Sequence, residues 1–243
     1  MIKNYKIKNL IISYYHSLHF FSICVILKLN NMDIFITIFS LIVLLFSVII
    51  HELAHGSVAY SLGDPTAKYD GRLTLNPLKH LDPFGSIILP LLLFAGGSPM
   101  LIGWAKPVPI NPHNFKDQKW GTLKVAIAGP SSNMAVALFF GLLLRAVPLD
   151  FFAMAPGMFL IFSFTVWINI ILAIFNLLPI PPLDGSWILL RFLPDRFEKT
   201  KIFLHQYGLF ILIFFIFFGG LSGLGALAHF LYNIMVGASF SLF

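Results

Sequence analysis

The sequence predicts an all-α integral membrane protein with about five to six transmembrane helices. Hydrophobic residues make up 58% of the 243 residues, whereas charged residues make up only 11%. An average soluble domain carries about 25% charged residues. Several apolar stretches are long enough to cross the hydrocarbon core of a bilayer as helices. The polar stretches between them are too short to form a soluble domain.

Residues 1–31 are the least regular part of the chain. Lys3, Lys6 and Lys8 precede a mixed stretch that lacks the apolar core and the cleavage site of a signal peptide. We expect these residues to be an N-terminal extension. Either they form an additional span, or translation begins at Met32. Residues 32–243 are then expected to form a single domain.

The apolar segments after Met32 follow one another with short connections. They cover residues 34–59, 84–103, 123–147, 157–178, 202–218 and 221–242. Gly219-Gly220 separates the last two, which predicts a tight helical hairpin.

Residues 104–112 interrupt the helical pattern with three prolines, and this predicts an extended chain. Together with the preceding apolar residues they form a re-entrant or β-hairpin-like segment near 84–112. An exposed strand there could pair with an unwound peptide by strand addition, or the segment could be a passive loop.

One short motif, His51-Glu52-Leu53-Ala54-His55, lies at the end of the first apolar segment. On a helix, His51 and His55 lie one turn apart on the same face, so both can bind one Zn²⁺ while Glu52 serves as a general base. Ionisable groups at membrane depth are costly unless they are paired or bind a metal. The alternative is a polar helix end that carries histidines by chance.

A second group of residues ends the fourth apolar segment, where three prolines between Asn176 and Gly185 predict an unwound chain. Asp184 follows these prolines. It could cap the helix that begins at Ser186, or it could turn inward as the third ligand that the histidine pair lacks. Residues 129–133, Gly-Pro-Ser-Ser-Asn, are a third feature, which predicts either close helix packing or a contact with substrate.

The positions of the motifs restrict how the chain crosses the membrane. If every apolar segment crossed once, His51 and Asp184 would lie about 30 Å apart. A re-entrant segment within 84–103 brings the motifs to one face instead. It also places eleven of the twelve Lys and Arg residues after Met32 on that face, and the positive-inside rule puts that face in the cytoplasm. A shifted first helix, with His51 at mid-span, would also satisfy the geometry.

These motifs together resemble the site-2 protease family of intramembrane zinc metalloproteases. The His-Glu-x-x-His motif matches the zinc motif of that family, and residues 176–185 match its Asn…Pro…Leu-Asp-Gly motif. Residues 129–133 match its Gly-Pro-x-x-Asn element. Residues 71–77 and 103–109 resemble a compact prokaryotic branch without PDZ or CBS modules.

The resemblance implies a zinc-dependent intramembrane endopeptidase with its zinc site at the core of the helix bundle. Its substrates would be transmembrane or membrane-associated peptides, in regulated intramembrane proteolysis or in the clearance of signal-peptide remnants. The expected location is the prokaryotic inner membrane, and a homo-oligomer is left open. The implied ligands of one Zn²⁺ are His51, His55 and Asp184; Glu52 would be the catalytic base, and Asn176 would help to hold the oxyanion or the substrate strand.

Other functions agree less well with the residues. A pseudoprotease that only binds membrane clients would not need Glu52. A metalloprotease of another family would need Glu198, which lies in a charged loop, as its third ligand. The net charge of +6 arises mainly from short loops, which indicates membrane orientation and not nucleic-acid binding. His80 and His113 lie in polar loops and are expected to be solvated.

Overall fold

The structure is a computed structural model that describes residues 27–28, 34–97, 100–101, 103–148, 151–152 and 156–237. Most of the predicted N-terminal extension lies outside the described residues. The exception is β1, Leu27–Lys28, which pairs in antiparallel fashion with β2, Met100–Leu101.

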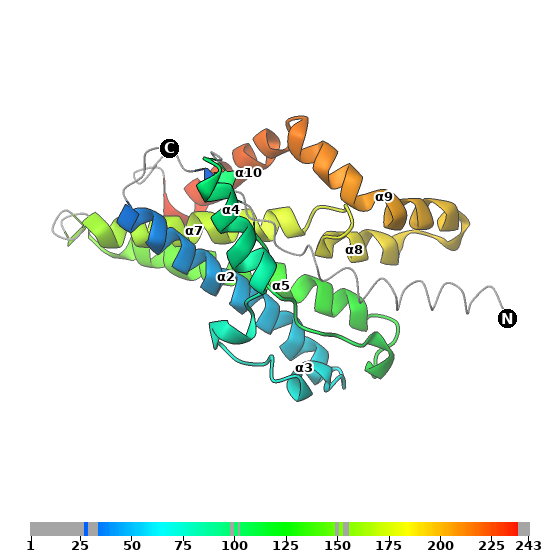
Figure 1. The fold of residues 1–243 in the computed structure, drawn as a ribbon. Coiled ribbons are helices and arrows are strands. Elements are labelled where there is room, and N and C mark those ends of the chain that lie inside the picture. The colour runs from blue at the N-terminus through cyan, green and yellow to red at the C-terminus, as the bar shows by residue number, and fades with distance from the viewer. Residues whose placement is uncertain are drawn as a thin grey trace.

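Three long helices form the centre of the fold (Figure 1): α2, Ile34–Ser61, α5, Gly121–Ala146, and α7, Pro156–Asn176. Each is a nearly continuous apolar sequence. Their facing sides are filled by small and branched side chains such as Ala137, Val166 and Ile170, all of them fully buried. Burial of this kind on helices that are also apolar outside is typical of a bundle surrounded by lipid.

The connection between α2 and α5 starts and ends at the same end of this bundle. It holds α3, Thr66–Tyr69, and three short turns of helix, η1, Pro77–Lys79, η2, Pro83–Ile88, and η3, Pro112–Asn114. The backbone N–H of Lys116 donates to the carbonyl of Leu62 at 2.8 Å. The buried carboxylate of Asp64 accepts from the N–H of Asn111 at 2.6 Å, so the two ends of the connection are fastened together.

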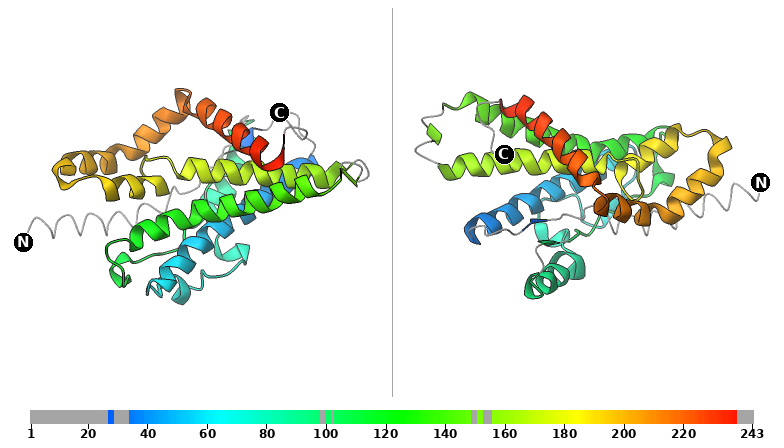
Figure 2. Two further views of the ribbon diagram at one scale, coloured as in Figure 1. Left: turned by 180° about the vertical axis from the view of Figure 1, so that it is seen from behind. Right: turned by 90° about the horizontal axis from the view of Figure 1, so that it is seen from above.

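Within this connection, residues 83–95 are helical, with η2 continuing into α4, Leu89–Ala95. Figure 2 shows this segment projecting from the bundle beside α2. The chain then returns, and the N–H of Trp104 donates to the carbonyl of Gly85. The predicted β-hairpin is wrong for the residues described, because β2 pairs with β1 and not within 84–112. Residues 103–111 form neither helix nor strand, and Asn111, the last of them, has extended backbone angles, so the proline-rich stretch interrupts the helical pattern as predicted.

The proline-rich stretch after α7 breaks the helix as predicted. α7 ends at Asn176, and α8, Asp184–Phe192, begins only after the last of the three prolines. A Cβ atom at Gly185 would overlap the carbonyl of Leu177, so α8 can fold back against the end of α7 only because this residue is glycine.

The last two helices are joined by a tight turn, as predicted, but they diverge from it and do not pack as a tight hairpin (Figure 1). After η4, Asp195–Phe197, come α9, Glu198–Phe217, and α10, Gly220–Val236. Gly219 joins them with a φ of 92°, a left-handed conformation that glycine adopts without strain. α10 packs on α5 and α7, where its Ala228, Tyr232 and Val236 complete the largest buried cluster.

Four helices among the described residues are long and apolar enough to cross a membrane. They are residues 38–61 of α2, all of α5, residues 157–176 of α7, and α9. Residues 83–95 and 220–236 form shorter apolar helices. Apart from the short β1–β2 pair, the described residues form a helical fold with long apolar helices, and the difference from the predicted five to six spans lies in these two shorter helices.

Candidate metal centre

His51 and His55 meet on the inner face of α2. Both side chains are buried, and their Nε2 atoms are 3.0 Å apart. The two residues are four positions apart on a continuous helix, so their side chains project from the same face one turn apart. The helix alone therefore provides half of a tetrahedral site.

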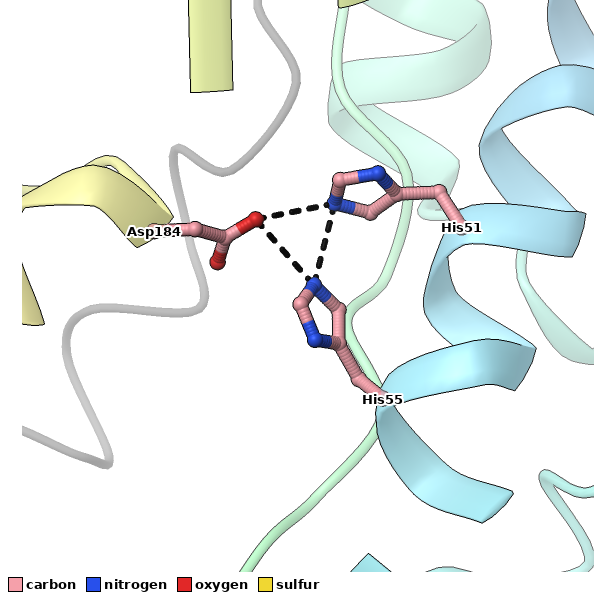
Figure 3. A group of neighbouring side chains, drawn as sticks. All are labelled: His51, His55 and Asp184. Atoms are coloured by element: carbon pink, nitrogen blue, oxygen red, sulfur yellow. Dashed lines mark hydrogen bonds and ion pairs between the residues drawn. The ribbon is translucent and has the colours of Figure 1, made fainter. Parts of the chain in front are cut away.

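Asp184 completes this group from a distant part of the chain. Its Oδ2 atom lies 3.1 Å from His51 Nε2 and 3.2 Å from His55 Nε2, as Figure 3 shows. Neighbouring ligands about 2.0–2.1 Å from a tetrahedral Zn²⁺ are about 3.3 Å apart. The three atoms therefore match one face of a zinc tetrahedron, and a fourth position remains for water or substrate.

The helix that carries Asp184 does not use it as a cap. Leu183 is the residue at the helix start, and Asp184 is already the first residue of α8. The capping interpretation of the sequence is thus not what the structure shows.

The other ring nitrogens of both histidines donate to oxygen atoms. His51 Nδ1 donates to Asn133 Oδ1 at 2.6 Å, and His55 Nδ1 donates to the backbone carbonyl of Val125 at 2.7 Å. Both oxygens can only accept, so Nδ1 carries a proton and Nε2 is the nitrogen left to bind a metal. Metal-binding histidines are usually oriented in this way.

Gly129 lies directly against the metal-facing edges of the histidines. A Cβ atom at this position would be 2.6 Å from His51 Nε2 and still closer to His55 Nε2. The Gly-Pro-Ser-Ser-Asn sequence on α5 therefore allows close helix packing, one of its two predicted roles, whereas the contact of Asn133 with His51 was not predicted. Its glycine leaves room beside the imidazoles, and Asn133, one helical turn later, contacts His51.

Glu52 is buried beside the same helix face. Its Oε2 atom accepts the backbone N–H of Val108 at 2.8 Å, and Val108 is itself fully buried. Val108 belongs to residues 103–111, which were predicted to be either a strand that pairs with substrate or a passive loop. This segment contacts the Glu52 carboxylate. A backbone donor leaves no signal in the sequence.

Asn176 is buried at the last position of α7. Its Nδ2 donates to the carbonyl of Leu172 at 2.9 Å, and its Oδ1 has no partner among the described residues. The structure does not bring its side chain into hydrogen bonding with His51, His55 or Asp184. A buried amide oxygen without a partner is a free acceptor for a bound ligand.

The remaining candidates stay outside this centre. Glu198 begins α9 and is no part of the metal-ligand cluster, which consists of His51, His55 and Asp184 in the described ranges. His80 was expected to be solvated, and that is wrong. Its ring is buried, with Nε2 2.9 Å from the carbonyl of Thr74, because the connection after α2 folds into a compact unit.

The chain is similar to several known proteins. The family described as peptidase family M50 matches residues 152–218. YwhC of Bacillus subtilis is 42% identical over 176 residues, which are 71% of this chain and 77% of that protein. Rip2 of Mycolicibacterium smegmatis is 32% identical over 70% of this chain and 62% of its own length.

A third relative, MJ0611 of Methanocaldococcus jannaschii, is 32% identical over 69% of this chain and 78% of its own length. All three are named as provisionally assigned zinc metalloproteases. No solved structure matches the chain.

Proposed function

This chain belongs to peptidase family M50, the site-2 protease family of metalloendopeptidases, and on that premise we propose that it cleaves transmembrane or membrane-associated peptides within the bilayer. The observation that carries the proposal is the triangle of His51, His55 and Asp184 at the centre of a lipid-exposed helix bundle. These three residues would hold one Zn²⁺. Bound zinc would polarise the scissile carbonyl and make water a stronger nucleophile.

Glu52 is the catalytic base in this proposal. It is adjacent to His51 on α2, and its carboxylate is oriented by the Val108 N–H at 2.8 Å. Glu52 takes a proton from the attacking water and passes it to the leaving nitrogen of the substrate. The buried, unpartnered Oδ1 of Asn176 accepts a backbone N–H of the bound peptide, which would hold the substrate strand beside Asp184.

The depth of the site supports cleavage within the bilayer. His51 and His55 lie six to ten residues before the end of α2, which is about 9–15 Å along the helix axis. Gly129 and Asn133 lie a similar distance after the start of α5. The site is thus well inside the helical bundle, and the exposed outer faces of these helices carry large apolar side chains such as Ile42 and Phe139.

Residues 83–95 form the re-entrant segment in this proposal. Thirteen helical residues reach only about 20 Å, less than the roughly 30 Å of the hydrocarbon core. Leu91, Leu92 and Phe94 are more than half exposed, which suits contact with lipid. Because Trp104 hydrogen-bonds to Gly85, the chain leaves where it entered.

The positive-inside rule then places the active site toward the cytoplasm of a prokaryotic inner membrane. Arg145 lies in the last turn of α5, and of the Lys and Arg residues in 34–237 it is the one that the re-entrant arrangement puts on the opposite side.

The experiment that tests the proposal is cleavage of single-span model substrates by detergent-purified protein, beside the Glu52→Gln variant, with bound zinc measured in both. A loss of about 10²–10⁴-fold in turnover at equal zinc content is expected from removal of a general base. Equal cleavage by both proteins would refute the role of Glu52. Zinc without cleavage of any substrate by the wild type would favour a client-binding pseudoprotease.

A further inference from the structure

A buried chain of polar side chains runs from the metal centre into the helix bundle. It joins Asn133 of α5, Asn169 of α7 and Ser47 of α2, and each is at most 3% exposed. Asn133 Nδ2 donates to Asn169 Oδ1 at 2.8 Å, and Asn169 Nδ2 donates to Ser47 Oγ at 2.8 Å. Buried polar groups away from water are retained only when they are satisfied, and these three are.

Backbone carbonyls determine the direction of every hydrogen bond in this chain. Ser47 Oγ donates to the carbonyl of Val43 at 2.8 Å, so it must accept from Asn169. Asn169 Nδ2 also lies 2.9 Å from the carbonyl oxygen of Thr165. Because a carbonyl oxygen can only accept, the atom of Asn169 that faces it must be Nδ2. The Oδ1 of Asn169 must therefore face Asn133.

The hydrogen bonds of the Asn133 side chain also have a fixed direction, and they determine which atom faces His51. Asn133 Nδ2 is required both by Asn169 Oδ1 and by the carbonyl of Ser47, which it reaches at 3.1 Å. Its Oδ1 is therefore the atom that faces His51, 2.6 Å from Nδ1. An amide oxygen accepts only, so His51 keeps its proton on Nδ1 and presents the Nε2 lone pair to the metal.

We propose that Asn169, which lies outside every motif of the sequence, is a positioning residue that selects the metal-binding tautomer of His51 through Asn133. Without Asn169, only the Ser47 carbonyl at 3.1 Å would hold the Asn133 amide in this orientation. The amide could then turn over more readily and present Nδ2, which favours the His51 tautomer with its proton on Nε2. That tautomer cannot bind a metal through Nε2. This inference rests on the zinc site proposed above.

The test is the zinc dissociation constant of purified protein, measured by competition with a chelator and without any substrate. Asn169→Leu keeps the size of the side chain but removes the acceptor for Asn133. It is expected to weaken zinc binding about 10–100-fold, the usual effect of losing an outer-shell partner. Asn169→Asp, in its neutral form, keeps an acceptor toward Asn133 and one O–H donor toward the Thr165 carbonyl. Its zinc affinity is therefore expected to lie closer to that of the wild type than to that of Asn169→Leu.

Thr165→Val is the matched control. It removes a buried hydroxyl from α7 that donates to the Ile161 carbonyl. This hydroxyl takes no part in the hydrogen bonds between Ser47, Asn169 and Asn133, so zinc binding is expected to be unchanged. The absorption spectrum of bound Co²⁺ provides a second readout, and Asn169→Leu alone among the three variants is expected to alter it. Equal zinc affinity for Asn169→Leu and the wild type would overturn the inference, and so would equal losses in the Leu and Asp variants.

Three further outcomes are decisive. If Asn169→Leu does not fold, Asn169→Ala, which also removes the acceptor for Asn133, replaces it, and unchanged zinc affinity in Asn169→Ala then counts against the inference. If the wild type binds zinc tightly but cleaves no peptide, the proposed proteolysis fails while the inference about Asn169 stands. If the wild type binds no zinc, both fail.

Discussion

The backbone N–H of Val108 donates to the carboxylate of Glu52 across 56 positions of sequence, at a distance of 2.8 Å. This hydrogen bond connects residues 103–111 to the helix that carries the two histidines. It makes the loop between α2 and α5 part of the site and not only a link between helices.

Replacing Val108 with proline removes this donor. The buried carboxylate then loses a hydrogen bond worth about 1–3 kcal/mol, and we expect turnover of a model substrate to fall about tenfold or more while zinc content stays the same. Val108→Ala keeps the N–H and serves as the control. The N–H of Ile110 does not contact Glu52. A similar fall in turnover for Ile110→Pro would therefore indicate that pairing with a substrate strand is the more important role of this segment.

Gly129→Ala places a methyl group against the metal-facing nitrogens of His51 and His55. We expect this variant to bind zinc much more weakly than the wild type and to lose peptide cleavage. Gly223→Ala is the control, because a Cβ at Gly223 meets nothing within 4 Å. Zinc content measured on both purified variants checks the prediction. One zinc per chain in Gly129→Ala would show that α5 or the histidine side chains can shift to make room for the methyl group, and would contradict the prediction.

Asp184→Asn replaces the carboxylate that joins the two imidazoles. An amide is a much poorer zinc ligand, so zinc binding and cleavage are expected to be lost together. Asp117→Asn is the control, because Asp117 lies in the loop before α5 and pairs with Lys124 of α5, and not with either histidine. Chelation of zinc from the wild type should reproduce the loss of Asp184→Asn, and added zinc should restore activity only in the wild type.

The orientation in the membrane can be tested with single cysteines. In a Cys24→Ala background, Lys119→Cys and Pro148→Cys would lie at opposite ends of α5, both at exposed positions. A membrane-impermeant maleimide applied to intact bacterial cells should label the residue at 148 and should label the residue at 119 only after lysis. The reverse pattern would place the metal centre toward the outside, and labelling of both from one side would mean that α5 does not span.

Local sequence determined the parts of the site that depend on one element. The spacing of His51 and His55 puts them on one face because an α-helix repeats every 3.6 residues. The prolines after Asn176 end α7 because proline cannot continue a helix, and Gly219 turns the chain between α9 and α10. The long apolar segments predicted the membrane fold for a similar reason, since length and composition alone set the solvent that a helix prefers.

The contacts between elements could not be predicted from local sequence. The pairing of β2 with β1 in place of a hairpin, the burial of His80, and the hydrogen bonds from Val108 to Glu52 and from His51 to Asn133 all join residues that are not neighbours in sequence. Such contacts depend on how helices and loops pack. Asn169 shows the limit most clearly: in the sequence it is one polar residue in an apolar helix, and its partners become known only when α2, α5 and α7 are placed side by side.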